Sequence, residues 1–182
     1  MQFKSATAFA NFLAGKIGQA ERATVTALRD AGDMIQHEAR DSLGSYHGPV
    51  GPIPSWPELS ERTQREREER GLSPDDPLLA TGELQEHIDV STSARKLVVG
   101  VPHEEVGDGS HVNPVRDIGM VAIAMEQGEV TRRASVPPRP FLSRAAHVMA
   151  EHCAAEILHA VGDAVANVPH IRPHQIKDDI PF

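Results

Sequence analysis

Apolar residues recur at helical spacing through the first quarter of the chain and predict two consecutive helices. The stripe of the first helix consists of Phe9, Phe12, Leu13 and Ile17. Ser5 is placed to cap the start of this helix. Glycine destabilises a helix interior, so Gly15 and Gly18 predict a kink or a break before residue 20. The stripe then resumes and predicts a long amphipathic helix over residues 20–43, with Gly44 as its stop.

Glycine and proline dominate the next segment, residues 44–57, which holds three glycines and four prolines. Proline fixes φ and removes a backbone donor, so this segment is predicted to be an extended loop. A loop of this length is usually disordered or functional. Residues 58–70 then predict a short and very polar helix, ended by Gly71, with Glu–Arg pairs four residues apart. This composition favours a solvated face over a partner site.

Alternation of apolar and polar residues appears after the short polar helix. Residues 88–92 and 96–101 form two such runs, and the short gap between them predicts an antiparallel hairpin. Residues 115–125 fit a helix by their spacing, although their unbroken apolar run would also suit a strand. Asn113 followed by Pro114 supplies a cap and a first helical residue, which favours the helix.

The last third of the chain predicts a loop or irregular strand over residues 128–136, then a long helix from about residue 140 to 167. The predicted fold class is α+β, with both long helices packed on one face of a small antiparallel sheet. We expect a single domain over residues 1–167, including the extended loop 44–57. Residues 168–182 are expected to be a C-terminal extension that lies over a neighbour or hangs free.

Composition limits the classes of function. The 182 residues contain only 4% aromatics, so Leu, Ile, Val, Ala and Met must build the core. A formal charge of −8 argues against wrapping a nucleic-acid duplex, although a local basic patch is compatible with it. The single cysteine, Cys153, excludes an internal disulfide and fits a reducing compartment; its apolar helical setting predicts an inert buried thiol. The sequence shows neither a signal peptide nor an apolar run that would span a bilayer.

Motifs for catalysis or cofactor binding are missing from the sequence. It contains no Gly-rich phosphate loop, no paired-cysteine zinc spacing and no nucleophile elbow. His152, Glu156 and His159 share one helical face and could offer ligands to zinc, but a solvated helix face is the preferred interpretation. We therefore predict no enzyme activity, no cofactor and no metal site.

Arginines and a lone tryptophan are the candidate contact residues. The arginines that cluster before and within the last helix are Arg132, Arg133, Arg139 and Arg144. They are expected either to pair with acids such as Glu126 and Glu129 or to face an acidic partner surface or DNA. Trp56, in the extended loop, is expected either to anchor on the domain's own core or to dock on a neighbouring subunit.

Four short phrases, taken in order, resemble the tail-completion or head–tail joining proteins of long-tailed bacteriophages and the related Mu-type virion morphogenesis proteins. The phrases are Trp56-Pro57-x-Leu59-Ser60-x-x-Thr63, Leu78-Leu79-x-Thr81-Gly82-x-Leu84, Ala122-x-x-x-Glu126-x-Gly128 and Pro138-Arg139-Pro140-Phe141-Leu142. Residues 31–40 also fit the first helix of that family, and the resemblance spans roughly residues 5–167. Two positions depart from the family pattern, because Gln127 replaces an aromatic residue and Glu129 replaces a threonine.

The resemblance implies a virion protein at the junction of capsid neck and tail, present in host cytoplasm during assembly. Each subunit would join a homo-oligomeric ring, commonly sixfold, through which DNA passes. Its partners would be the head-completion or portal side, the tail terminator or tail tube protein, and genomic DNA in the lumen. Loop 44–57 and the tail 168–182 would become ordered on contact with neighbours.

The resemblance also suggests roles for individual residues. The proposed interface residues are Trp56, Arg132, Arg133, Arg139 and Phe141. The residues expected to specify the fold are Thr81, Gly82, Leu84, Gly128, Pro138 and Pro140. Two alternatives remain open: a tail terminator or other neck ring protein, and a non-viral cytosolic module that binds a partner through its acidic surface.

Overall fold

The computed structural model describes residues 3–93, 95–130 and 135–166. Its helices are α1 (Ala6–Ser42), α2 (Glu61–Glu69), α3 (Glu83–Glu86), α4 (Ile118–Gln127) and α5 (Phe141–Ala166). Its strands are β1 (Asp89–Ser93), β2 (Lys96–Gly100), β3 (Glu105–Val106), β4 (Arg116–Asp117), β5 (Glu129–Val130) and β6 (Ser135–Val136). The fold is α+β, as the sequence predicted.

Helix α1 runs without interruption for 37 residues, a length of about 55 Å. Its start is the predicted one, because the hydroxyl of Ser5 accepts a hydrogen bond from the Ala8 amide at 3.1 Å. Gly44, with φ +92°, follows its end. The predicted break at Gly15 and Gly18 is wrong. Each glycine costs about 1 kcal/mol, and the alanines and charged residues around them are good enough helix formers to carry the helix through.

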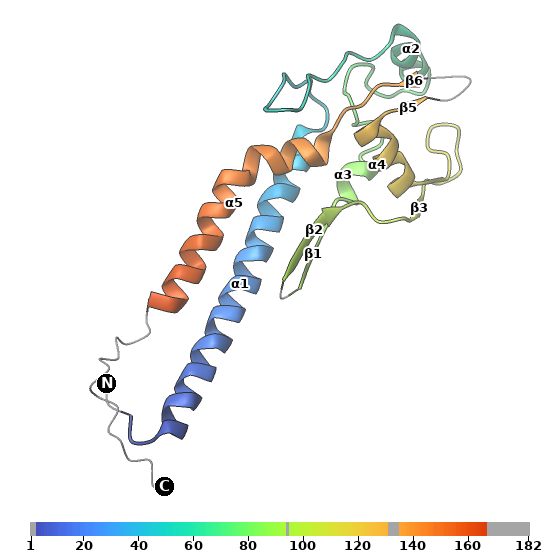
Figure 1. Ribbon diagram of the computed structural model, residues 1–182. Helices are drawn as coiled ribbons and strands as arrows, with labels where there is room; N and C mark the ends of the chain where they lie inside the picture. Colours follow the sequence, from blue (N-terminus) through green and yellow to red (C-terminus); the bar gives the residue numbers. More distant parts are fainter. Residues whose placement is uncertain (1–2, 94, 131–134, 167–182) are drawn as a thin grey trace.

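Helices α1 and α5 pair antiparallel and form a rod, called here the two-helix rod (Figure 1). Two contacts fix their register: Cys153 Sγ lies 3.6 Å from the Ala31 carbonyl oxygen, and Arg144 Nη1 lies 3.2 Å from Glu38 Oε1. The buried residues along this pairing are small: Ala27, Ala31 and Ala39 on α1, with Ala145 and Cys153 on α5. Small side chains let the two backbones approach closely.

In the described residues, the strands form three separate two-stranded antiparallel sheets, β1–β2, β3–β4 and β5–β6. The expected single sheet under both long helices is therefore corrected. The β1–β2 hairpin packs on α1, and α5 runs along α1 elsewhere (Figure 1). Gly32 makes room for this packing, because a Cβ added there would come within 2.6 Å of side-chain carbons of Val90 and Leu97. Among the strands of the described residues, β1 and β2 are the ones that make extensive contacts with α1.

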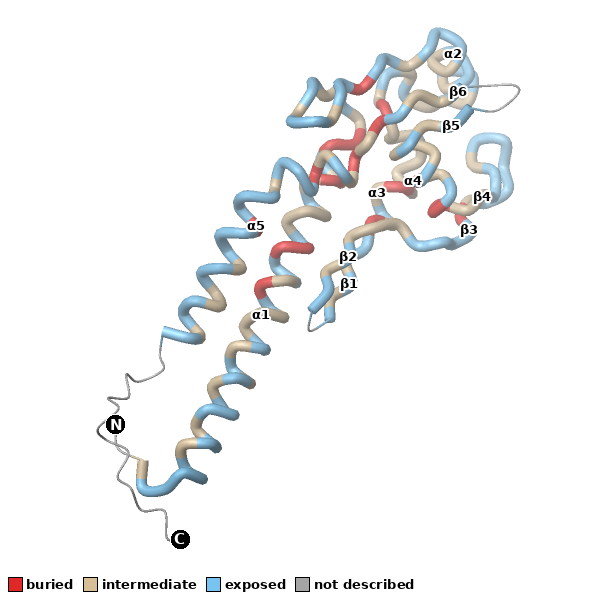
Figure 2. The backbone as a smooth tube through the Cα atoms, in the orientation of Figure 1, coloured by how far each residue is buried: buried red, intermediate tan, exposed pale blue. Residues whose placement is uncertain are grey.

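The remaining elements gather at one end of the rod, and we call this part the globular end. It comprises α2, α3, α4 and β3–β6 with their connecting loops, and the adjoining ends of α1 and α5 (Figure 2). The largest fully buried side chains are Phe141, Ile88, Ile118 and Pro77. Buried residues become sparse along the rod, and among the described residues none lies N-terminal to Ala27. The core thus sits where the rod meets the globular end.

Two helix boundaries in the globular end differ from the expected ones. Helix α4 is a helix, as favoured, but Asp117 caps it by accepting a hydrogen bond from the Met120 amide at 3.1 Å. Asn113 instead donates to Glu83 Oε1 at 2.6 Å, a partner distant in sequence. Helix α2 starts at Glu61 behind a Ser60 cap, three residues later than predicted.

Candidate functional site

Three predicted interface residues lie in the core and are corrected here. Trp56 and Arg139 are each 4% exposed, and Phe141 is 0% exposed. Of the two expectations for Trp56, the structure supports the one in which its ring packs into the domain's own core. Its ring meets the His47 ring edge-on at 4.8 Å between centroids. Arg132 and Arg133 lie outside the described residues.

Arg139 joins the start of α5 to the segment before α2. Its Nε and Nη2 donate to the Pro57 carbonyl oxygen at 3.1 and 2.9 Å, and Nη2 also donates to the Glu58 carbonyl oxygen at 3.1 Å. Its backbone amide donates to the Met125 carbonyl oxygen at 2.7 Å. Burial lowers the pKa of the Arg139 guanidinium, although arginine remains charged at neutral pH. The expected pairing of Arg139 with Glu126 or Glu129 is replaced by these carbonyl contacts.

Glu126 has a role that the sequence reasoning missed, because it caps a helix fifteen residues further on. Its carboxylate oxygens accept hydrogen bonds from the amides of Leu142 at 3.0 Å and Ser143 at 2.9 Å. These amides belong to the first turn of α5, where backbone donors have no partner within the helix. The negative charge also suits the positive end of the helix dipole. Sequence rules look for caps within four residues, and the resemblance included Glu126 in its third phrase without giving it a role.

The residues expected to specify the fold occupy two tight turns. Gly82, with φ +85°, precedes α3 in a conformation that favours glycine. Beside it, the Thr81 hydroxyl donates to Glu83 Oε2 at 3.1 Å, and Arg116 Nη2 donates to the same oxygen at 2.7 Å. Leu84 is buried next to this cluster.

The second turn connects α4 to the entry of α5. Gly128 has φ +77°, and a Cβ added to it would lie 2.9 Å from Pro138 Cδ. Pro140 immediately precedes the first residue of α5, where a helix backbone has no need of a donor. These positions suit a scaffolding role, which remains a prediction.

The extended loop 44–57 is held by its own chain. The Tyr46 hydroxyl donates to Asp75 Oδ1 at 2.6 Å and accepts from the Leu59 amide at 3.0 Å. Partial burial, followed by the bond to Asp75, raises the pKa of Tyr46. The Trp56 amide donates to the His47 carbonyl oxygen at 2.9 Å. The expectation that this loop becomes ordered only on a neighbouring subunit is therefore corrected.

A cleft of about 480 Å³ opens in the globular end, between α2, the 78–84 segment, α4 and the residues before α5. Its apolar lining includes Leu59, Leu78, Leu84, Ile118, Val121 and Met125. The arginines that line it are Arg67, Arg70, Arg116 and Arg139. An apolar floor with a few convergent charged groups is the usual composition of a binding site. We take this arginine-lined cleft as the candidate functional site.

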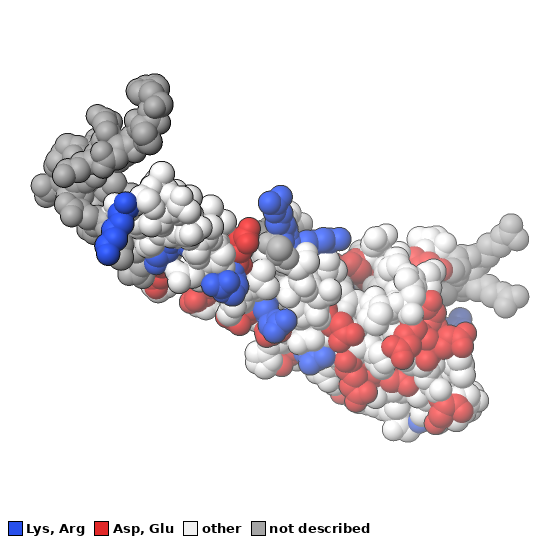
Figure 3. Space-filling model, turned by 90° about the horizontal axis from the view of Figure 1, so that it is seen from below, with Lys and Arg blue, Asp and Glu red and all other residues white. Residues whose placement is uncertain are grey.

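Charge is distributed unevenly between the parts of the chain. Residues 58–130 contain 16 acidic and 7 basic residues, a net charge of −9, against −8 for the whole chain. On the face seen in Figure 3, acidic side chains crowd the globular end, and lysines and arginines are more frequent along the rod. The arginines of the cleft therefore lie within the most acidic part of the molecule.

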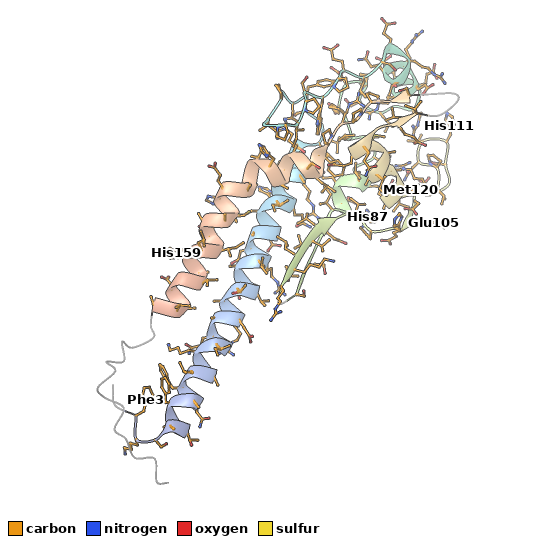
Figure 4. The ribbon with its side chains drawn as sticks, in the orientation of Figure 1. Phe3, His87, Glu105, His111, Met120 and His159 are labelled. Atoms are coloured by element: carbon orange, nitrogen blue, oxygen red, sulfur yellow. The ribbon has the colours of Figure 1, made fainter. Side chains whose placement is uncertain are left out.

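Metal and thiol chemistry receive little support from the described residues. His152, Glu156 and His159 are all exposed on α5, and His159 Nδ1 lies 3.5 Å from Asp163 Oδ2 (Figure 4). Within residues 3–93, 95–130 and 135–166, no group of three potential ligands is arranged to hold a metal ion. Cys153 is buried, as predicted, and burial raises the pKa of its thiol.

None of the helices in the described part of the chain is long and apolar enough to cross a lipid bilayer. No protein-family model, curated protein or solved structure matches the chain.

Proposed function

We propose that this chain is a structural virion protein of a tailed phage and forms a ring at the head–tail interface through which DNA passes. One observation supports the proposal most. The phrases that carry the resemblance are scattered over residues 56–142 but meet in the globular end. Arg139 of the last phrase binds the Pro57 carbonyl of the first, and Glu126 of the third caps the helix that opens in the last. The shared residues thus serve packing and capping, as suits a protein that works by shape.

A ring subunit needs surfaces that neighbours can cover, and the described chain offers apolar ones. On the rod, Ile17 is 60% exposed and Leu158 is 73% exposed. On α4, Met120, labelled in Figure 4, and Ile123 lie three residues apart and are both exposed. Exposed apolar positions grouped on one element suit a protein–protein contact. The proposed partners are further copies of the chain, the neck or portal side, and the tail terminator or tail tube. The proposal includes no catalytic step and no cofactor.

Purified particles provide the direct test. Quantitative mass spectrometry should find about six copies of the chain per particle, and gold-labelled antibody should locate them at the neck. Native mass spectrometry of the purified chain tests whether it forms the ring by itself. A strictly monomeric protein that is absent from particles would overturn the proposal. Label at the distal end of the tail would refute the neck position.

The acidic globular end favours one candidate of a different class, a non-viral module that binds a basic protein partner. The net charge of −9 over residues 58–130, most of which belong to this end, would steer such a partner by electrostatics. The same particle analysis separates the two, since the module would be absent from virions. A tail terminator would instead be present, with its label on the tail side of the junction.

The paired arginines Arg132 and Arg133 carry a more specific prediction, although they lie outside the described residues. Replacing both with glutamate should lower head–tail attachment, because their charge is proposed to face an acidic neighbour or DNA. Attachment is scored as the ratio of infectious to total particles. Replacement of both by lysine keeps the charge and should leave the ratio unchanged. A normal ratio for the glutamate variant would exclude this role.

A further inference from the structure

Positive charge in the arginine-lined cleft is only partly neutralised by the chain itself. Arg116 is paired with Glu83, at 2.7 Å. Arg67, Arg70 and Arg139 form no ion pair with a carboxylate anywhere in the described residues. Three guanidinium groups therefore line one cleft without a direct ion pair among the described residues, although the charges of Asp76 and Asp75 act on Arg67.

Within the part of the chain that the structure describes, each of these three guanidinium groups donates its hydrogen bonds to backbone carbonyl oxygens. Arg67 Nη1 donates to Asp76 at 2.6 Å and to Ser73 at 3.4 Å. Arg70 Nη2 donates to the Val112 carbonyl oxygen, and its Nε is buried without a partner within the described residues. Carbonyl groups satisfy donors but do not cancel charge, so an anion entering the cleft would gain attraction from all three.

Partial burial makes this arrangement costly. Loss of solvation lowers the pKa of Arg67 and of Arg139, and in both cases a neighbouring arginine adds to the effect. Of the two carboxylates at the edge of the cleft, Glu66 is already paired with Arg62 at 2.7 Å. Glu58 also lines the cleft, and the carboxylates of Asp76 and Asp75, which do not line it, partly offset the lowering of the Arg67 pKa. The cleft therefore suits an added negative group next to an apolar one, since its floor is apolar.

One segment of this chain has that chemistry. Residues 178–182, outside the described part, read Asp-Asp-Ile-Pro-Phe, two carboxylates followed by three apolar residues. The geometry points to this acidic–apolar segment as the occupant of the arginine-lined cleft of a neighbouring copy. The carboxylates of Asp178 and Asp179 would meet Arg67 and Arg70. Ile180 and Phe182 would cover the apolar floor. This inference rests on the proposed function in requiring adjacent copies.

Chain length favours a neighbouring copy over the same chain. Arg139 lines the cleft just before α5 begins, and α5 is 26 residues long. Ala166 therefore lies about 39 Å from that edge of the cleft, at 1.5 Å per residue. Residues 167–177 reach at most about 36–40 Å when fully extended. Flexible chains of this length span only about 20 Å on average, so a return to the cleft of the same copy would be strongly disfavoured.

A labelled peptide tests the contact directly. The peptide spans residues 174–182, and the receptor is the full chain carrying Asp178→Asn, Asp179→Asn and Phe182→Ala, so that its own segment does not compete. Fluorescence anisotropy should show saturable binding that weakens about tenfold or more when the peptide carries the same three substitutions. Adding Arg70→Gln to the receptor should have an effect of similar size.

The matched control is Arg65→Gln, which removes an exposed arginine of α2 that does not line the cleft. It should leave binding unchanged. Trp56 fluorescence and far-UV circular dichroism establish that each receptor is folded. Equal binding of both peptides, no effect of Arg70→Gln, or no saturation below about 1 mM would overturn the inference.

A photo-crosslinker in place of Phe182 in the full chain decides between copies. Crosslinks should migrate as dimers on a denaturing gel and join residue 182 to peptides that contain Leu59 or Met125. Crosslinks confined to monomers would refute a contact between copies. The peptide result and the particle analysis are independent. If the peptide binds but the protein is absent from virions, the inference stands and the proposed function is refuted. If the protein is found at the neck but the peptide does not bind, the proposed function stands and the inference is refuted.

Discussion

Replacement of Arg139 by alanine should destabilise the globular end more than any substitution on its surface. The guanidinium is 4% exposed and donates three hydrogen bonds to the carbonyl oxygens of Pro57 and Glu58. A hydrogen bond from a charged donor contributes about 1.5–3 kcal/mol, and the three are not additive because they share one side chain. The loss of these bonds, together with the cavity left behind, should lower the free energy of unfolding by about 3–5 kcal/mol.

Urea unfolding provides the assay, and the chain supplies its own probe. Trp56 is the only tryptophan and is buried beside the contact, so its fluorescence reports unfolding of the globular end. Far-UV circular dichroism reports mainly the helices of the rod. With a slope of about 2 kcal/mol per M urea, the midpoint should fall by roughly 1.5–2.5 M. The two probes should separate in the variant if the globular end unfolds before the rod.

Two further variants separate charge from volume at this position. Arg139→Met keeps most of the volume but removes all donors, so it should recover only the part of the loss that comes from the cavity. Arg139→Lys keeps the charge but cannot match the forked contact with both carbonyl oxygens. Both should lie between alanine and the wild type. A loss below about 1 kcal/mol for Arg139→Ala would refute the assigned role, because such a value is typical of an exposed residue.

Three other predictions follow from the structure, each measured by urea unfolding or by thiol labelling. Glu126→Ala removes the cap of α5 and should lower the free energy of unfolding by about 1–2 kcal/mol. Glu129→Ala changes an exposed acid on the neighbouring strand and should lower it by less than about 0.5 kcal/mol, and equal losses would contradict the capping role. Gly32→Ala should be less stable than Gly15→Ala by about 1–3 kcal/mol, because both gain helix propensity but only Gly32 lies against the β1–β2 hairpin; equal stabilities would contradict that packing. Cys153 should react with a thiol reagent at pH 8 much more slowly in the folded chain than in urea, and equal labelling rates would show that the thiol is accessible. Burial raises the pKa of this thiol only in the folded state, so its contribution to stability should be lost as pH rises above the usual thiol pKa.

Local pattern was sufficient to predict most elements of this protein. The Ser5 cap, the stop at Gly44, the β1–β2 hairpin and the long last helix follow from periodicity and turn chemistry within a few residues. The burial of Cys153 followed from its apolar helical run. These features depend on short-range hydrogen bonds and on which face of an element is apolar, and both are written in adjacent residues.

Other features could be decided only by contacts between distant residues. The sequence could not show that Arg139 would find its acceptors at Pro57 and Glu58 rather than at the nearby acids. Nor could it show that Glu126 would cap a helix that begins fifteen residues later. A charged side chain is expected at the surface unless partners distant in sequence satisfy it, and local pattern carries no information about such partners.

The continuity of α1 and the separation of the strands into several sheets also depend on contacts that local pattern does not show. Gly15 and Gly18 weaken the helix locally, but the favourable residues around them and the packing of the later turns on α5 outweigh that cost. The β1–β2 hairpin was predictable from its local pattern, but β3 and β4 were not, and the separation of the strands into three sheets within the described residues depends on contacts across the fold. The sequence by itself determined the elements and their apolar faces. Only the tertiary structure decided which polar groups are buried together, because that depends on distances across the fold.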